Sequence, residues 1–177
     1  VIIILESFGN EFVGAMSGNE SYTPFLDSII GESLSFEYGI ANGKKSIEAV
    51  PAILASMPSL MGNPYISSPY GNNKINSLAS ILKKEGYETG FYHGATNGSM
   101  RFDAFTSAAG FDAYYGRDEY PNQSHFDGNW GIEDHHMLSF AIDEMNHFKT
   151  PFFSMVFTLS SHHPYTIPST YKSKVKV

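Results

Sequence analysis

The feature that most constrains the fold of this sequence is the alternation of short apolar runs with segments of helical periodicity. Residues 1–5 are all β-branched or aliphatic, and residues 87–93 and 151–159 are further candidate strands. A strand that is apolar on both faces is typical of a parallel sheet covered by helices on each side. We therefore expect an α/β fold with a mostly parallel central sheet sandwiched by helices, in which residues 1–5 form a central strand.

The spacing of apolar residues predicts helices between these strands. Thr23-Pro24 resembles an N-cap followed by proline at the first helical position. A second helix is expected to begin near Ser46, where Pro51 is tolerated only if the helix starts at or just before it, or bends there. The other expected elements are a short strand at residues 34–41 and helices at residues 78–86, 102–109 and 131–148.

Length and composition limit the classes of protein to consider. The 177 residues suit one domain, and we expect a single domain over residues 1–177 that is truncated at both ends, because the first residue is not Met and lies in an apolar run. The absence of Cys excludes disulfides and thiolate catalysis. The 11 basic residues are scattered among 18 acidic ones, which disfavours a nucleic-acid partner. No apolar run approaches the roughly 20 residues of a membrane-spanning helix.

Candidate functional residues follow the predicted strands, where ligands bind in open α/β sheets. Glu6, His93 and His162 each come at or just after a strand end, and Ser46 begins a helix. A carboxylate beside an apolar strand must be paired, hydrogen-bonded or bound to a cation if it is buried, and the alternative is an exposed loop residue. Ser46 is either an ordinary cap or a nucleophile placed where a helix start favours anions.

Two histidine pairs need separate interpretation. His162 and His163 lie in a loop, and adjacent histidines there usually point in different directions, so at most one should serve a site. Residues 134–136 (DHH) are expected to be a solvated helix start, because neighbouring side chains diverge around a helix axis rather than converge on one ion. No dinucleotide-binding, P-loop or nucleophile-elbow pattern is present.

The candidate residues belong to a series of blocks along the chain. The blocks are residues 1–8 (VIIILESF), 23–27 (TPFLD), 43–51 (GKKSIEAVP), 92–94 (YHG), 110–112 (GFD), 130–134 (WGIED) and 158–165 (TLSSHHPY). Their order and spacing resemble the alkaline phosphatase/sulfatase superfamily and, within it, the lipoteichoic acid synthase-like branch. The third block lies where relatives carry a Thr or Ser nucleophile, and its spacing from hydroxyl to proline resembles the T-A-x-S-V-P run of phosphoethanolamine transferases.

This resemblance implies a role for each matched residue. Glu6 would bind a divalent metal, Mn most readily with Zn, Mg or Ca as alternatives. Ser46 would be both the nucleophile and a metal ligand, and His162, His93 and Arg101 would contact the substrate. The implied reaction is phosphoryl transfer through a covalent phospho-Ser46, on lipid or polymer phosphodiesters of the cell envelope. The resemblance also implies a catalytic domain outside the cytoplasm, anchored by N-terminal membrane helices that precede this chain.

Two alternatives stay open at this point. The first is sulfuric ester hydrolysis on the same fold, which the absence of the C/S-x-P-x-R sulfatase signature disfavours. The second is an envelope module without turnover. Met100 and Phe102 fall where relatives carry the Trp and Arg that contact the substrate, which favours this second alternative.

Overall fold

The computed structural model describes residues 1–18 and 20–174, which divide into two compact units. Of the described residues, one unit contains 1–6 and 42–174, and the other contains 7–18 and 20–41. The strands are β1 (Ile2–Ile4), β2 (Glu88–Tyr92), β3 (Ala113–Tyr115) and β4 (Phe152–Phe157). The α-helices are α1 (Gly14–Ser17), α2 (Pro24–Ile30), α3 (Ser46–Ala55), α4 (Leu78–Lys84), α5 (Phe102–Ala108) and α6 (Asp134–Met145).

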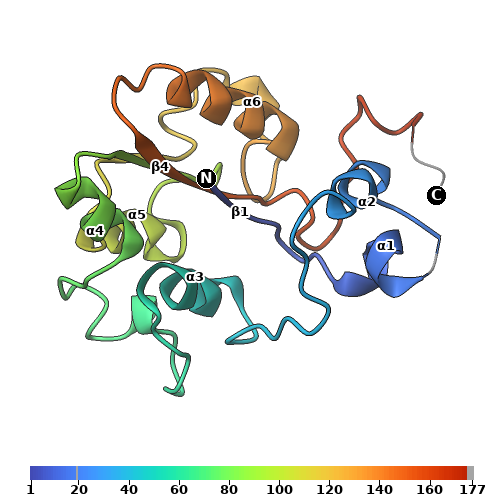
Figure 1. Ribbon diagram of the computed structural model, residues 1–177. Coiled ribbons are helices and arrows are strands. Elements are labelled where there is room, and N and C mark those ends of the chain that lie inside the picture. Colours follow the sequence, from blue (N-terminus) through green and yellow to red (C-terminus); the bar gives the residue numbers. More distant parts are fainter. Residues whose placement is uncertain (19, 175–177) are drawn as a thin grey trace. The chain divides into compact units, whose positions relative to one another are not determined.

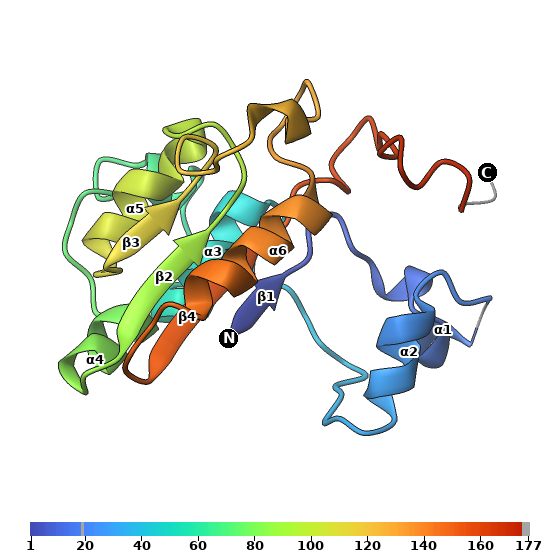
Figure 2. The same ribbon diagram turned by 90° about the horizontal axis from the view of Figure 1, so that it is seen from above.

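The four strands of the larger unit form one parallel sheet in the order β1-β4-β2-β3 (Figure 2). Ile3 is in register with Val156, and Phe91 is in register with both Met155 and Tyr114. Because every pairing is parallel, the carboxyl ends of all four strands lie at one edge of the sheet. The expected α/β class with a mostly parallel sheet is confirmed.

Helices cover both faces of this sheet (Figure 1). Phe91 and Met155 face α3, α4 and α5 and lie in a core that includes Leu54 and Phe105. The next residues along these strands, Tyr92 and Val156, face the opposite way and pack in a second core with Met137 and Ala141 of α6. This alternation explains why β2 and β4 are apolar on both faces.

The first strand differs from the expectation that it would be central. Among the described residues β1 pairs only with β4, so it is the outermost strand of the sheet. Ile2 and Ile4 pack against the core beneath α3, whereas Ile3 on the other face is 54% exposed. The reason is that α6 packs mainly on β2 and β4.

Three other sequence expectations are corrected. Residues 34–41 form no strand, and their apolar side chains are exposed instead of packed against a sheet. The helix expected over residues 131–148 is limited to α6, because Gly131 and Ile132 form bridges with Ala95 and Phe126. Pro51 is the sixth residue of α3, well inside it rather than at its start.

The smaller unit contains two short helices, α1 and α2. Thr23 precedes α2 and Pro24 is its first residue, as expected, although the Thr23 side chain makes no capping hydrogen bond. The Asp27 carboxylate accepts a hydrogen bond from the Ala15 backbone N–H at 3.0 Å and so joins α2 to α1. The hydrogen bond from Ser21 is the main reason that the pKa of Asp27 lies below its ordinary value. In the described part of the chain, no helix has the length and apolarity needed to span a membrane.

Candidate active site

Glu6 is placed by the pairing of β1 with β4. The Thr158 backbone N–H donates to the Ile4 carbonyl at 3.0 Å, which extends the pairing beyond β4. The Thr158 hydroxyl then accepts a hydrogen bond from the Glu6 backbone N–H at 2.8 Å. These contacts fix the half-buried Glu6 at the carboxyl edge of the sheet, the position that sequence analysis predicted for it.

Ser46 is the first residue of α3, and its hydroxyl donates a hydrogen bond to Glu6 Oε2 at 2.6 Å. Glu48, two residues further on, accepts hydrogen bonds from the backbone N–H groups of Lys44 (2.7 Å) and Lys45 (3.2 Å). The Lys44 contact is the main reason that the pKa of Glu48 lies below its ordinary value. Glu48 therefore holds the loop before α3 in the shape that presents Ser46 to Glu6.

A cavity of about 280 Å³ lies at this contact. Its lining residues are Glu6, Lys44, Lys45, Ser46, Ile47, Met100 and His162. One carboxylate and one hydroxyl offer oxygen ligands to a cation, while two lysines and the helix start favour an anion. The cavity therefore offers oxygen ligands for a cation and positive charge for the phosphate or sulfate group of an ester bound to that cation.

His162 reaches the cavity from the loop after β4. Its Nδ1 lies 3.2 Å from the His163 carbonyl oxygen, which can only accept, so Nδ1 carries the proton of the neutral ring and Nε2 is the basic nitrogen. The ring packs on Trp130 with centroids 3.7 Å apart, and Trp130 Nε1 donates to the His163 carbonyl at 2.7 Å. The exposed His163 does not line the cavity, so only one histidine of the pair lies at the site.

Asp134 fixes the same loop from α6. Its carboxylate accepts hydrogen bonds from the backbone N–H groups of Leu159 (2.7 Å) and Ser160 (2.8 Å), and its own N–H donates to the Ser160 hydroxyl at 2.8 Å. Burial raises the pKa of Asp134 above its ordinary value, although these hydrogen bonds act to lower it. Asp134 is therefore not a solvated residue of the helix start, as sequence analysis expected, but a partly buried anchor of this loop. Sequence analysis assigned no role to Trp130.

His93 lies behind the cavity in the apolar core. Only 2% of the residue is exposed, and its ring stacks on Phe157 with centroids 4.4 Å apart. Its Nδ1 lies 3.1 Å from the Phe157 carbonyl oxygen. Burial lowers the pKa of His93 to about 4, so the ring is neutral at pH 7. In this arrangement the ring contacts core side chains, and its predicted contact with substrate stays a prediction.

Arg101 lies outside the residues that line the cavity. Its guanidinium donates to Asn72 Oδ1 at 2.6 Å, and its φ of 60° lies in the left-handed region. The preceding residue, Met100, has a φ of 48° and lines the cavity in its place, while Phe102 is buried in the core. The predicted substrate contact of Arg101 stays a prediction.

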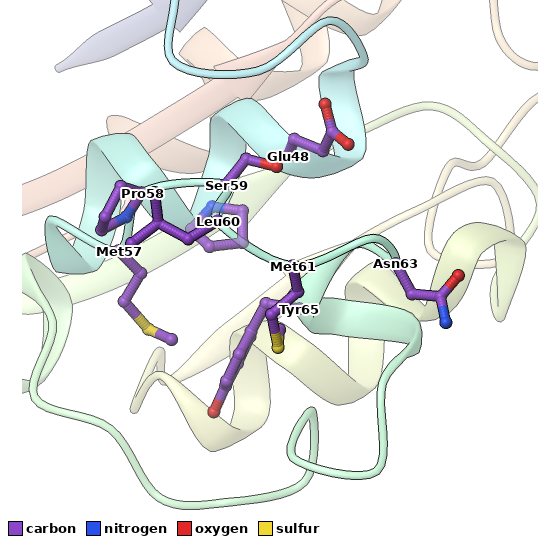
Figure 3. A pocket seen from close by; sticks show the side chains of 9 residues that line it. Glu48, Met57, Pro58, Ser59, Leu60, Met61, Asn63 and Tyr65 are labelled. Carbon is purple, nitrogen blue, oxygen red and sulfur yellow. The ribbon is translucent and has the colours of Figure 1, made fainter.

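Two other hollows lack this combination of groups. The one between α3 and the loop that follows it, shown in Figure 3, has a volume of about 10 Å³, which holds about one water molecule. A larger open hollow of about 570 Å³ lies beside α4 and α5, and no carboxylate or histidine lines it. Of these three, only the cavity at Glu6 and Ser46 is lined by a carboxylate, a serine hydroxyl and a histidine, so we take it as the candidate active site.

Comparison with known proteins shows the family to which the chain belongs. The family model described as Sulfatase matches residues 1–177. The chain is 28% identical over 174 residues to lipoteichoic acid synthase 1 of Bacillus subtilis (strain 168), a match that covers 93% of this chain and 27% of that protein. The chain thus spans about a quarter of the length of this curated relative.

Solved structures share the fold. A protein of the alkaline phosphatase superfamily from Vibrio parahaemolyticus superposes with a TM-score of 0.86 and 30% identity, covering 95% of this chain and 41% of that one. The lipoteichoic acid synthase LtaP from Listeria monocytogenes superposes with a TM-score of 0.82 and 23% identity, covering 97% of this chain and 43% of that one. The parallel sheet and its helices are therefore the same architecture as in these proteins.

Proposed function

Because this chain belongs to the sulfatase family and to the lipoteichoic acid synthase-like branch of its superfamily, we propose that it is part of a metal-dependent phosphotransferase or phosphodiesterase. Its substrates would be lipid or polymer phosphodiesters of the cell envelope. The reaction would pass through a covalent phospho-Ser46. The observation that carries this proposal is the 2.6 Å contact between Ser46 Oγ and Glu6 Oε2 in a cavity also lined by His162.

The residues of the cavity fit a divalent cation. Glu6 and Ser46 offer one carboxylate oxygen and one hydroxyl oxygen, which suit a hard or borderline ion such as Mn²⁺, with Zn²⁺, Mg²⁺ or Ca²⁺ as alternatives. Two ligands are fewer than the four to six that such ions take, so the bound ion would need further ligands. When bound, the ion would lower the pKa of the Ser46 hydroxyl and stabilise negative charge on phosphoryl oxygens.

The first half of the reaction uses three residues of this chain. Ser46 Oγ attacks phosphorus, so that an O–P bond to Ser46 forms while the P–O bond to the departing alcohol breaks. Glu6 Oε2, already the acceptor of the Ser46 hydrogen bond, takes the Ser46 proton, and the departing alkoxide takes a proton from water. His162 Nε2 binds a phosphoryl oxygen when the ring is protonated.

The second half of the reaction begins with the phosphoryl group attached to Ser46. Water or an acceptor hydroxyl attacks phosphorus and releases its proton to solvent, while the bond from phosphorus to the Ser46 oxygen breaks and Ser46 recovers its proton from Glu6. Lys44 and Lys45 stabilise the anionic substrate electrostatically throughout, since both line the cavity. Transfer and hydrolysis differ only in the second nucleophile, which is an acceptor hydroxyl in transfer and water in hydrolysis.

The proposed location is outside the cytoplasm, on a protein anchored in the membrane. The similarity to lipoteichoic acid synthase 1 supports this proposal, since an envelope polymer is reached from that side. The net charge of −7 and the scattered basic residues are consistent with a substrate other than nucleic acid.

The test uses the full-length protein with Mn²⁺ and a panel of aryl phosphodiesters, aryl phosphomonoesters and aryl sulfates. We expect phosphodiester cleavage that Ser46→Ala reduces by roughly 10³-fold or more, because the nucleophile is lost. Ser139→Ala is the matched control, since the Ser139 hydroxyl bonds only the His135 carbonyl of its own helix and lies outside the cavity. Turnover of sulfates alone, or full activity of Ser46→Ala, would reject the proposal.

A further inference from the structure

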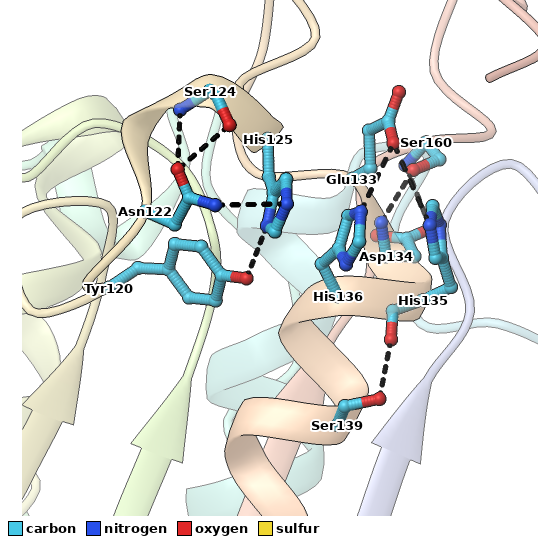
Figure 4. Close-up of polar contacts among 10 residues, drawn as sticks. All are labelled: Tyr120, Asn122, Ser124, His125, Glu133, Asp134, His135, His136, Ser139 and Ser160. Atoms are coloured by element: carbon cyan, nitrogen blue, oxygen red, sulfur yellow. Dashed lines mark hydrogen bonds and ion pairs between the residues drawn. The ribbon is translucent and has the colours of Figure 1, made fainter. Parts of the chain in front are cut away.

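A cluster of metal-binding side chains lies at the start of α6 (Figure 4). Glu133 precedes the helix, and His135 and His136 are its second and third residues. The Nε2 atoms of His135 and His136 lie 3.8 Å and 3.9 Å from Glu133 Oε2. One ligand atom from each residue lies within 4.8 Å of the others. This convergence contradicts the expectation that residues 134–136 form a solvated helix start with diverging side chains.

The two histidines converge because they lie in the first helical turn. Side chains of a helix tilt toward its N-terminus, so those of the first turn extend past the helix end. The rings of His135 and His136 lie 3.9 Å apart, and His136 also stacks on His125 at 3.5 Å. Glu133 has an extended backbone (φ −52°, ψ 134°) that brings its carboxylate back over the same end.

The donor set suits a borderline transition metal. Two imidazole nitrogens and one carboxylate oxygen are ligands that Zn²⁺ takes at about 2.0–2.2 Å, which in a tetrahedral site separates ligand atoms by about 3.4 Å. The two distances to Glu133, 3.8 Å and 3.9 Å, therefore need to contract by a few tenths of an ångström, and the two histidine ligand atoms lie within 4.8 Å of each other. The three side chains are only 23–31% exposed, so they are partly ordered by packing yet still open to an ion from solvent.

His125 positions His136 without being a ligand itself. Asn122 Oδ1 accepts from the Ser124 N–H (3.1 Å) and hydroxyl (2.8 Å), which orients Asn122 Nδ2 toward His125 Nε2 at 3.1 Å. His125 Nδ1 lies 2.6 Å from the Tyr120 hydroxyl. Both ring nitrogens of His125 are therefore engaged, and its ring serves as a flat support on which His136 stacks.

The cluster is separate from the candidate active site. None of Glu133, His135 and His136 lines the cavity at Glu6 and Ser46. Asp134, which lies between them in the sequence, is not available as a ligand in this arrangement because both its oxygens accept backbone hydrogen bonds from the loop after β4. The positive end of the α6 dipole opposes a cation, and the carboxylate of Glu133 offsets it.

We propose that Glu133, His135 and His136 form a second metal site, selective for Zn²⁺ and similar borderline ions over Mg²⁺ and Ca²⁺. Hard ions prefer sites made of oxygen alone, whereas two imidazoles favour Zn²⁺, Ni²⁺ and Co²⁺. A bound ion bridges the residue before α6 to the first turn of the helix. Binding therefore stabilises the segment from which Asp134 holds the loop that carries His162.

The test is a titration of the metal-free full-length protein with Zn²⁺ and, for spectroscopy, with Co²⁺. We expect the double variant His135→Ala/His136→Ala to bind one equivalent of Zn²⁺ fewer than wild type. It should also lose the visible Co²⁺ absorption bands of a site with nitrogen ligands. Glu133→Gln should weaken binding at this site by roughly tenfold or more. Ser46→Ala should still bind the Zn²⁺ equivalent held by Glu133, His135 and His136. This result distinguishes that ion from any ion at the candidate active site.

His147→Ala is the matched control, because His147 is an exposed histidine beyond the other end of α6. It should keep both the Zn²⁺ equivalent and the Co²⁺ bands. Circular dichroism of each metal-free variant checks that the fold is retained. An unchanged Zn²⁺ stoichiometry in the folded double variant, or an equal loss in His147→Ala, would overturn the proposal. Equal binding of Mg²⁺ at this site would also overturn it.

Discussion

The hydroxyl of Ser46 donates a hydrogen bond to Glu6 Oε2 at 2.6 Å although 40 positions separate the two residues. Glu6 comes from the end of β1 and Ser46 from the start of α3, so the contact depends on the packing of α3 against the sheet. A serine and a carboxylate so placed can exchange a proton and share a cation.

Glu6→Gln keeps the size of the side chain and removes its charge. We expect the apparent affinity of the full-length protein for Mn²⁺ to fall by roughly tenfold or more, because a neutral amide is a much weaker ligand. The measurement is activity as a function of Mn²⁺ concentration, together with calorimetric titration. Glu85→Gln is the control, since Glu85 is an exposed carboxylate at the end of α4. Equal Mn²⁺ dependence of Glu6→Gln and wild type would contradict the assigned role.

Gly43→Ala tests the loop that presents Ser46. Gly43 has a φ of 113°, and a Cβ there would lie 2.6 Å from Glu48 Cβ. We expect a loss of about 1 kcal/mol or more in the free energy of unfolding, and a lower kcat because Ser46 shifts away from Glu6. Urea unfolding and steady-state kinetics measure the two effects. Gly62→Ala should change little, since no atom lies within 4 Å of the added Cβ; an equal effect of both variants would refute this role of Gly43.

Asp134→Asn removes the charge that holds the loop after β4. An asparagine has one acceptor oxygen, so it cannot accept from both the Leu159 and Ser160 N–H groups as the carboxylate does. We expect a loss of about 1–3 kcal/mol in unfolding free energy, because a buried backbone donor loses its partner. If Asp134 positions His162, kcat falls while the fold is retained. Asp143→Asn, an exposed acid on the same helix, should have neither effect.

His93 makes the stability of the fold dependent on pH. Its pKa is lowered to about 4 by burial, whereas in the unfolded chain it is about 6.5. Between these values the unfolded state binds a proton that the folded state does not, so stability falls as the pH falls from about 6.5 toward 4. The loss from this residue between pH 7 and pH 5 is about 2 kcal/mol.

Urea unfolding at pH 7 and pH 5, with a chelator present, measures this dependence. His93→Gln lacks the titrating ring, so its stability should fall by about 2 kcal/mol less than that of wild type over the same range. His147→Gln, which replaces an exposed histidine, should keep the wild-type dependence. An identical pH dependence in His93→Gln and wild type would show that another group is responsible.

Sequence patterns predicted the parts of the fold that depend on local periodicity. The apolar runs at residues 1–5, 87–93 and 151–159 each contain a strand. For β2 and β4 the reason is that strands buried on both faces must be apolar on both faces, whereas one face of β1 is exposed. The strand β3 was missed because three residues, Ala113–Tyr115, are too few to show a period. The strand expected at residues 34–41 is wrong, since an alternating pattern does not by itself supply a neighbouring strand.

The proximity of three candidate site residues was predicted from the sequence, while their roles stay predictions. Glu6, Ser46 and His162 lie around one cavity, as the carboxyl edge of a parallel sheet requires. The burial of His93 was not foreseen, because a histidine at the end of a strand looks the same in sequence whether it faces solvent or the core. The convergence of His135 and His136 was also missed, since the argument from diverging neighbours holds within a helix and fails in its first turn.

The most direct test of a covalent phospho-Ser46 is to determine whether Ser46 is chemically modified during turnover. The full-length protein is mixed with Mn²⁺ and bis(p-nitrophenyl) phosphate, quenched in acid within one turnover, digested and analysed by mass spectrometry. We expect a p-nitrophenyl phosphoryl group on Ser46 that disappears as the reaction proceeds and is absent from Ser46→Ala. Turnover with an unmodified Ser46, or with the group on another residue, would contradict it.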